Sequence, residues 1–212
     1  MIRIDAREIQ KLYIGFFGRP ADPSGIKYWL ENSEDLLTLR EIYYVFSKQD
    51  EYLDLIAQDK SFQYQINRFY LNLFDRNSDI QSLNYWVEMI ENKDYQVADI
   101  LYNLIQINHN NHLKNAMLVE QDKNILNNKI HAADIFTKQI SKNSTLINLY
   151  QPESISPWIS GEAFLRASEF MNNVNSMKLS NEDVNSFIGS IFNITVDLFE
   201  RAIDIEDLSL AI

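Results

Sequence analysis

The segment from Leu12 to Leu30 recurs in altered form from Phe69 to Val87. The side chains that return at one constant spacing are Tyr13, Phe17, Arg19, Asp22, Tyr28 and Trp29, which recur as Tyr70, Phe74, Arg76, Asp79, Tyr85 and Trp86. A constant spacing across a whole segment indicates a duplicated structural unit. The fold must therefore accommodate two similar pieces in the first half of the chain.

Each copy is predicted to form two helices joined by a tight corner. The apolar residues before the first corner have the spacing of one helical face: Ile9, Leu12, Tyr13, Phe16 and Phe17. Gly18 and Pro20 end this helix, because glycine accepts a left-handed conformation and proline cannot continue the hydrogen-bond ladder. Asp22 followed by Pro23 is a helix-start signal, with the Asp22 carboxylate as N-cap.

The second copy keeps this design with weaker signals. Its substitutions at the corner are Asp75 for Gly18, Asn77 for Pro20 and Ser82 for Gly25. None of the three has the backbone freedom of glycine or the rigidity of proline. We therefore expect a looser second corner.

Arg19 and Arg76 follow the two corners, and two roles are open to them. The guanidinium can brace the corner by donating to free carbonyls at the helix end and pairing with the Asp three residues on. Alternatively, it can bind an anionic or sugar ligand. The retention of Arg together with Asp in both copies favours the bracing role.

Adjacent aromatic residues follow each corner as Tyr28 with Trp29 and Tyr85 with Trp86. Neighbouring side chains on a helix point about 100° apart, so both rings of such a pair are seldom fully buried. We expect Trp29 in the core and Tyr28 partly exposed.

The motif Tyr13, Phe17, Gly18, Arg19, Asp22, Gly25, Tyr28 and Trp29 resembles a helical repeat family of unassigned biochemical function. That family occurs in bacterial surface-layer proteins and secreted calcium-dependent adhesins, and it is distantly similar to phycobilisome linker domains. The resemblance is specific over residues 9–30 and fair over residues 66–87. It cannot be detected after about Ile107, so it covers roughly half of the chain. It implies a helical fold and a cell-surface setting, and it transfers no catalytic residue.

Composition agrees with an all-α protein, because Gly and Pro are few and helix-forming residues are abundant. We expect a multi-helix array of two tandem three-helix repeats, at about residues 5–57 and 61–108, followed by a C-terminal helical bundle over 109–212. In that second part, a long helix from Leu113 to Ile140 is predicted to break near Asn127 and Asn128. A loop follows over 143–161, then helices from Glu162 to Met177 and from Asn181 to Ile203.

The net charge of −11 disfavours nucleic acid, which is bound through Lys and Arg. The absence of Cys excludes disulfides and thiolate chemistry. No apolar run reaches the roughly 18 residues of a membrane span, and charges near Met1 argue against a cleaved secretory signal. Two locations remain possible for the protein: the cytoplasm, or the outside of the cell after export by a route that recognises a C-terminal signal. The resembling proteins use the second route, type I secretion, which implies that these residues begin a longer polypeptide.

No arrangement in the sequence predicts catalysis. His109 and His112 have ligand-like spacing but no acidic partner, which favours a solvated turn. Asp75, Asn77 and Asp79 mimic the start of a calcium loop, yet Trp86 occupies the place of its bidentate Glu, so helix capping is favoured. The acidic pairs Glu34–Asp35 and Asp50–Glu51 lie at expected helix starts, where the helix dipole favours them. Phosphate loops and serine elbows are absent, so we expect no enzyme.

We expect a cell-surface anchoring domain of a surface-layer protein that binds lipopolysaccharide O-antigen glycan without covalent attachment. Sugar binding uses aromatic faces beside carboxylates and amides, and the candidate residues, which we expect at the surface, are Tyr28, Tyr44, Tyr85, Tyr150 and Trp158. Calcium is the one cofactor that the acidic surface suggests, as a bridge to anionic glycan, and neighbouring copies in a lattice are further partners. The alternatives are a linker-like scaffold module, intracellular or phage-borne, and a helical appendage of a glycan-modifying enzyme.

Overall fold

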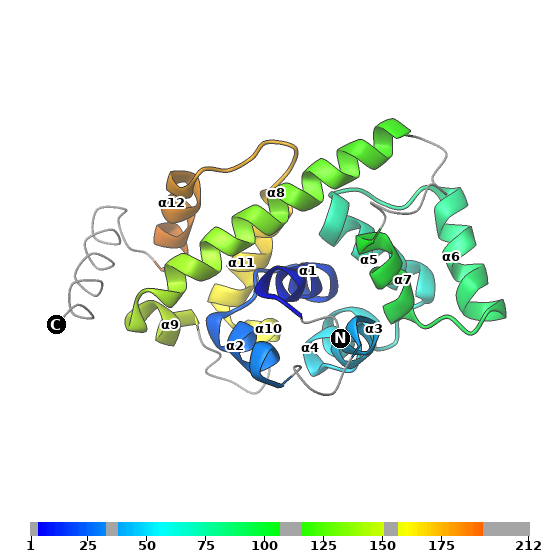
Figure 1. Ribbon diagram of the computed structural model, residues 1–212, viewed down its shortest axis with the longest axis horizontal. Coiled ribbons are helices and arrows are strands. Elements are labelled where there is room, and N and C mark those ends of the chain that lie inside the picture. Colours follow the sequence, from blue (N-terminus) through cyan, green and yellow to red (C-terminus); the bar gives the residue numbers. More distant parts are fainter. Residues whose placement is uncertain (1–3, 33–37, 107–115, 151–156, 193–212) are drawn as a thin grey trace.

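The computed structural model describes residues 4–32, 38–106, 116–150 and 157–192, which form helices and no strand (Figure 1). The all-α prediction is confirmed over this part of the chain. The boundary at residue 108, the pairs His109–His112 and Glu34–Asp35, and the helix end at Ile203 lie outside the described residues. In chain order the elements are α1 (Ala6–Phe17), α2 (Pro23–Asn32), α3 (Leu39–Phe46), α4 (Asp50–Tyr52), the π-helix η1 (Leu53–Ala57), α5 (Phe62–Phe74), α6 (Ile80–Asn92), α7 (Val97–Ile105), α8 (Ala116–Ser141), α9 (Ser144–Tyr150), α10 (Pro157–Ser160), α11 (Glu162–Asn173) and α12 (Asn181–Ile191).

The first corner has the predicted caps. Gly18 ends α1 in the left-handed region at φ 69°, and its N–H donates to the Ile14 carbonyl. Asp22 begins α2, since its Oδ1 accepts from the Gly25 N–H at 2.6 Å. Both ends of the corner therefore satisfy backbone groups that a helix terminus leaves without a partner.

The second corner has the same backbone design. Asp75 takes the left-handed conformation of Gly18, at φ 56°, and the Asp79 carboxylate accepts from the Ser82 N–H at 2.9 Å. Aspartate tolerates that conformation better than most residues, so the loss of glycine does not change the path of the chain. The two corners therefore share their backbone path, and the looser second corner stays a prediction.

A hydrogen bond across each corner is also shared, although the side chains differ. Gln10 Oε1 accepts from the Ala21 N–H at 3.0 Å, and Asn67 Oδ1 accepts from the Ser78 N–H at 3.0 Å. Helix α1 packs on α5, and α3 packs on α7, so the two helix–corner–helix units lie against each other. The interpretation of these units as tandem repeats stays a prediction.

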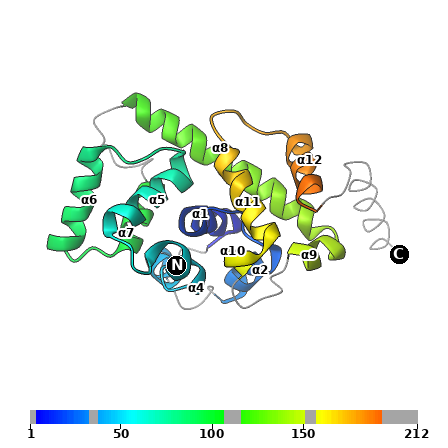
Figure 2. The same ribbon diagram turned by 180° about the vertical axis from the view of Figure 1, so that it is seen from behind.

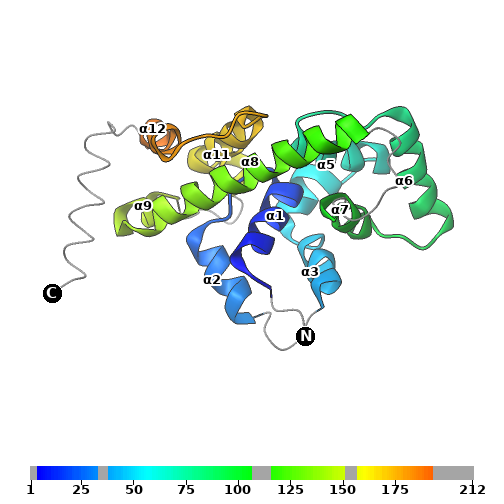
Figure 3. The ribbon, with the colours of Figure 1, turned by 45° about the horizontal axis from the view of Figure 1, so that its top comes forward.

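Helix α8 lies across both units (Figure 3). It packs on α1 and α5 and also contacts α2, α9 and α12, which confirms that a long helix bridges the two halves. The predicted break at Asn127 and Asn128 is wrong, because their amides make contacts outside the helix: Arg7 Nη2 donates to Asn127 Oδ1, and Asn128 Nδ2 donates to the Asn175 carbonyl. One apolar cluster continues from Ile4 in the first unit to Ile191 in α12.

Three buried polar side chains on one side of α8 bind the two corners. Asp122 accepts from Arg76, Thr137 Oγ1 donates to the Ala21 carbonyl at 2.6 Å, and Lys129 Nζ donates to the Leu71 and Asn72 carbonyls at 3.3 and 2.8 Å. Those two carbonyls lie in the last turn of α5, where the helix leaves carbonyls without intrahelical donors, although the Leu71 carbonyl also accepts from the Asp75 N–H at 3.1 Å. Burial lowers the pKa of Lys129 to about 8.

The predicted loop over 143–161 is wrong in part, because it contains α9 and α10. Asn143 caps α9, with its Oδ1 accepting from the Leu146 N–H at 3.1 Å. Helix α11 ends at Asn173, before the expected Met177. Figure 2 shows α10 and α11 on the face opposite that of Figure 1. None of the described helices combines the length and apolar character needed to span a membrane.

Candidate functional site

The guanidinium of Arg19 lies at the centre of the first corner and is almost fully buried, with 4% of its side chain exposed. Its Nε and Nη2 donate to the two oxygens of Glu51 at 2.7 and 2.8 Å. Its Nη1 donates to the Pro20 carbonyl at 3.0 Å and to Asp22 Oδ2 at 3.4 Å. The bracing role is confirmed, but the principal partner is Glu51 of α4, whose position in the sequence had indicated only a helix start.

Aromatic rings enclose this ion pair. The Arg19 Cζ lies 4.0 Å from the ring centre of Phe164, 5.0 Å from that of Tyr13 and 5.7 Å from that of Phe17. Burial alone would raise the pKa of Asp22, but Arg19 and the hydrogen bonds from Ser24 and Gly25 lower it overall. The corner therefore holds its charges in a largely apolar setting, where charge pairs interact strongly.

The second corner uses a different carboxylate. Arg76 Nε and Nη2 donate to the two oxygens of Asp122 at 2.8 and 2.6 Å, and Nη1 donates to the Asn77 carbonyl. Arg76 and Asp79, both in the described part of the chain, do not form the predicted ion pair. Arg76 binds Asp122 instead, and the Asp79 carboxylate accepts from the N–H and the hydroxyl of Ser82. Asp79 thus caps α6, and Asp75 ends α5, so the capping interpretation of these acids is confirmed.

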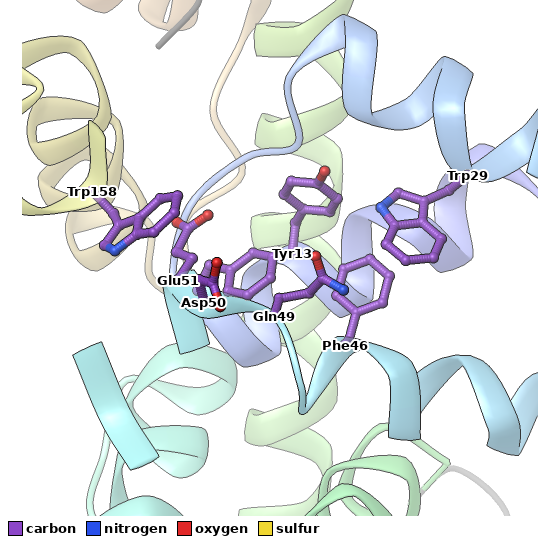
Figure 4. Close-up of a pocket in the computed structure, with 8 residues that line it drawn as sticks. Tyr13, Trp29, Phe46, Gln49, Asp50, Glu51 and Trp158 are labelled. Carbon is purple, nitrogen blue, oxygen red and sulfur yellow. The ribbon is translucent and has the colours of Figure 1, made fainter. Parts of the chain in front are cut away.

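A pocket of about 150 Å³ opens between the first corner and α10 (Figure 4). Trp158 and Trp29 lie on opposite sides of it, and the polar side chains of α4 and the preceding loop lie between them. Its lining residues are Tyr13, Phe17, Trp29, Phe46, Gln49, Asp50, Glu51 and Trp158. The pocket thus combines five aromatic residues with two carboxylates and one amide.

The polar side chains that line this pocket differ in whether they already have hydrogen-bond or ion-pair partners within the protein. Glu51 is committed to Arg19, and Gln49 Nε2 donates to the Val45 carbonyl at 3.3 Å. Trp158 Nε1 donates to Asp54 Oδ2 at 2.9 Å, which fixes the indole at the pocket edge. Asp50 is exposed, and its carboxylate makes no hydrogen bond or ion pair with any residue that the structure describes. Asp50 is therefore the group that can accept from a ligand.

Gly25 allows the tyrosine of the first corner to lie close to α2. A Cβ added to Gly25 would lie 2.1 Å from the Tyr13 hydroxyl oxygen. In the second corner Ser82 takes this position, and the Tyr70 hydroxyl accepts from Trp86 Nε1 at 3.1 Å. Burial raises the pKa of the Tyr13 hydroxyl, so it stays protonated in the physiological range.

The motif residues that pack both corners are buried as expected: Tyr13, Phe17, Trp29, Tyr70, Phe74 and Trp86. Of the residues predicted to bind glycan, Trp158 lines the pocket, and the exposed Tyr28 lies beside it, with its ring centre 5.2 Å from that of Trp29. Tyr44 and Tyr85 are exposed but do not line the pocket.

Tyr150 was expected at the surface, and this expectation is wrong. It is only 1% exposed, and its ring packs against Phe136 and Phe164 at centre distances of 5.4 and 5.2 Å. The reason is helix α9, which turns the side chain of its last residue towards α8 and α11.

A second pocket of about 310 Å³ lies between α3, η1, α5 and the loop from α6 to α7. Its lining contains no Asp, Glu or Trp and none of the residues predicted to bind glycan. Within the described ranges, no three His, Asp or Glu side chains are grouped to hold a metal ion. The first pocket is therefore the candidate site.

Comparisons with models of known families, with curated proteins and with solved structures found no match to this chain.

Proposed function

We propose that the chain is a glycan-binding module that anchors a surface-layer protein to lipopolysaccharide O-antigen on the outer surface of a Gram-negative cell. The observation that carries this proposal is the pocket between Trp29 and Trp158, with the open carboxylate of Asp50. Indole faces pack on the apolar face of a sugar ring, and a carboxylate accepts hydrogen bonds from its hydroxyls. A volume of about 150 Å³ suits one sugar ring rather than an extended chain.

The charges of the pocket favour binding over turnover. Glycoside cleavage by the common mechanism needs two carboxyl groups, one acting as acid and one as base or nucleophile. Here Glu51 is neutralised by Arg19, and Asp50 is exposed to water, so the two cannot share this work. We therefore propose that the module holds a glycan and does not cleave it.

Calcium and self-association belong to the same proposal. The chain carries a net charge of −11, so it would be repelled by an anionic glycan unless divalent cations lie between them. Neighbouring copies in a lattice would add binding sites, and several weak sites on one surface give a strong attachment.

A pull-down with smooth and rough lipopolysaccharide, each with and without a chelator, tests the anchoring role. Smooth lipopolysaccharide, which carries O-antigen, should retain the protein, and rough lipopolysaccharide should not. Trp158→Ala should abolish retention, whereas the matched control Tyr85→Ala removes an exposed aromatic ring outside the pocket and should not change it. Equal binding of the wild-type protein to both forms, or to neither, would rule out this function.

A scaffold role is the second candidate, and helix α6 favours it. This helix lies at one end of the molecule and packs mainly on α5 (Figure 1). Ile80 and Tyr85 on it are 68% and 51% exposed. Large apolar side chains that are exposed on a helix are candidates for protein contacts. If sedimentation shows self-association that Tyr85→Glu abolishes, while lipopolysaccharide is not retained, the scaffold role replaces the anchoring role.

A further inference from the structure

We propose that the pocket selects a positively charged sugar residue, a protonated amino sugar whose ammonium group pairs with Asp50. This inference rests on the proposed glycan-binding function and names the class of sugar that the site prefers. It follows from the balance of charge around the pocket and from the way the same corner already holds a cation.

The residues that line or contact the pocket carry more negative than positive charge. The lining carboxylates are those of Asp50 and Glu51, and Asp54 accepts from the lining indole of Trp158; in the described part of the chain, the guanidinium that pairs with one of them is that of Arg19, which binds Glu51. Arg19 compensates one of these charges. Asp54 accepts from a neutral indole, and Asp50 has no partner in the described structure, so the site attracts a cation.

The first corner shows how aromatic rings and a carboxylate hold a cation in this molecule. Arg19 lies over the rings of Tyr13 and Phe164 and pairs with Glu51. The pocket contains the same kinds of groups, with the buried indole of Trp29 and the half-buried indole of Trp158 on opposite sides and the exposed Asp50 carboxylate between them (Figure 4). Trp is the ring that binds cations most strongly.

The chemistry separates three kinds of sugar. An ammonium group can donate a charge-assisted hydrogen bond to Asp50, which is roughly twice as strong as a neutral one. An N-acetylated or hydroxylated sugar offers only neutral donors. A sugar acid would be repelled by Asp50 and Asp54. The site should therefore rank amino sugars first and sugar acids last.

Titration with glucosamine oligosaccharides, their N-acetylated forms and a neutral glucan tests this ranking. The titrations are followed by tryptophan fluorescence at fixed ionic strength and at about pH 6. We expect glucosamine oligosaccharides to bind the wild-type protein about tenfold more tightly than the N-acetylated forms. Asp50→Asn should remove this preference and leave weak binding of the neutral sugars unchanged.

Asp94→Asn is the matched control, because it also removes one negative charge but lies in the loop between α6 and α7, outside the pocket lining. Asp94 has φ 55°, a conformation that Asn also tolerates. The control should keep the preference. Circular dichroism should show native helix content in both variants, since Asp50 has no partner to lose.

Each outcome bears on the inference. If wild-type protein binds charged and neutral sugars equally, the preference is refuted and the glycan-binding function stands. If the preference survives in Asp50→Asn, or disappears equally in Asp94→Asn, the general negative charge of the surface explains it and the inference fails. If no sugar binds and smooth lipopolysaccharide is not retained, the proposed function and this inference fall together.

Discussion

Replacing Glu51 by Gln should destabilise the protein strongly, because it leaves the Arg19 cation buried without its main counter-charge. Only 4% of the Arg19 side chain and 7% of the Glu51 side chain are exposed. Breaking a buried ion pair by removing one partner typically costs about 3–5 kcal/mol. Gln retains one acceptor oxygen, and Asp22 stays 3.4 Å from Arg19, so we expect the lower end, about 3 kcal/mol.

The second corner supplies a comparison within the same chain. The Arg76 side chain is 24% exposed, so water can solvate it when its partner is lost. Asp122→Asn should therefore cost less, about 2 kcal/mol. The double variant Arg19→Met with Glu51→Leu removes both buried charges together and should regain most of the loss, since apolar replacements of a buried pair are often neutral.

Urea denaturation followed by circular dichroism measures these free energies of unfolding, and the single variants Arg19→Met and Glu51→Leu complete a thermodynamic cycle with the double variant. The pair should show a coupling energy above about 1 kcal/mol. If Glu51→Gln costs less than about 1 kcal/mol, or if the losses of the single variants simply add in the double variant, the pair does not hold the corner and the reasoning is refuted.

Three further changes test other contacts. The pKa of Lys129 is about 8 in the folded protein and 10.5 in the unfolded chain, so between these values the unfolded chain binds more protons. The free energy of unfolding should therefore rise by about 3 kcal/mol as the pH increases from 8 to 10.5. Lys129→Met should lack this rise when unfolding is measured by urea denaturation. Gly25→Ala should cost about 1–3 kcal/mol through the clash with Tyr13, while Ser82→Ala at the matching position should cost under about 1 kcal/mol by the same assay. Thr137→Val leaves a buried carbonyl without its donor and should lower the midpoint of thermal unfolding, corresponding to about 1–3 kcal/mol.

The corners could be predicted from the sequence because their signals are local. Gly18, Asp22 and Pro23 act on backbone groups within a few residues of themselves, and the structure has each in its expected role. Helix capping depends on such short contacts, so it is visible without knowledge of the tertiary structure.

The partners of the two arginines could not be predicted in the same way. Glu51 lies 32 residues after Arg19, and Asp122 lies 46 residues after Arg76. In the sequence, Glu51 has the pattern of an ordinary acid at a helix start. Only the packing of α4 and α8 against the corners reveals that these carboxylates are buried counter-ions.

The grouping of residues in the candidate pocket also could not be predicted from local sequence signals. Trp158 and Tyr150 lie in one segment that contains Pro152 and Pro157, and both were expected to be exposed. The structure separates them, because Asn143 starts a helix that buries Tyr150, whereas Trp158 meets Trp29 across the pocket. The aromatic residues themselves were a usable signal, but their grouping depends on contacts far apart in the chain.

The polar stripe of α8 has a consequence for the order of assembly. Asp122, Lys129 and Thr137 are spaced by about two helical turns each, so they fall on one side of the helix and fix where it can lie along both corners. A nascent chain that has emerged only as far as Ile105 lacks all three. Arg76 and the end of α5 therefore receive these partners only when α8 packs on them, whereas the contacts of α1 with α5 and of α3 with α7 lie within the segment already synthesised.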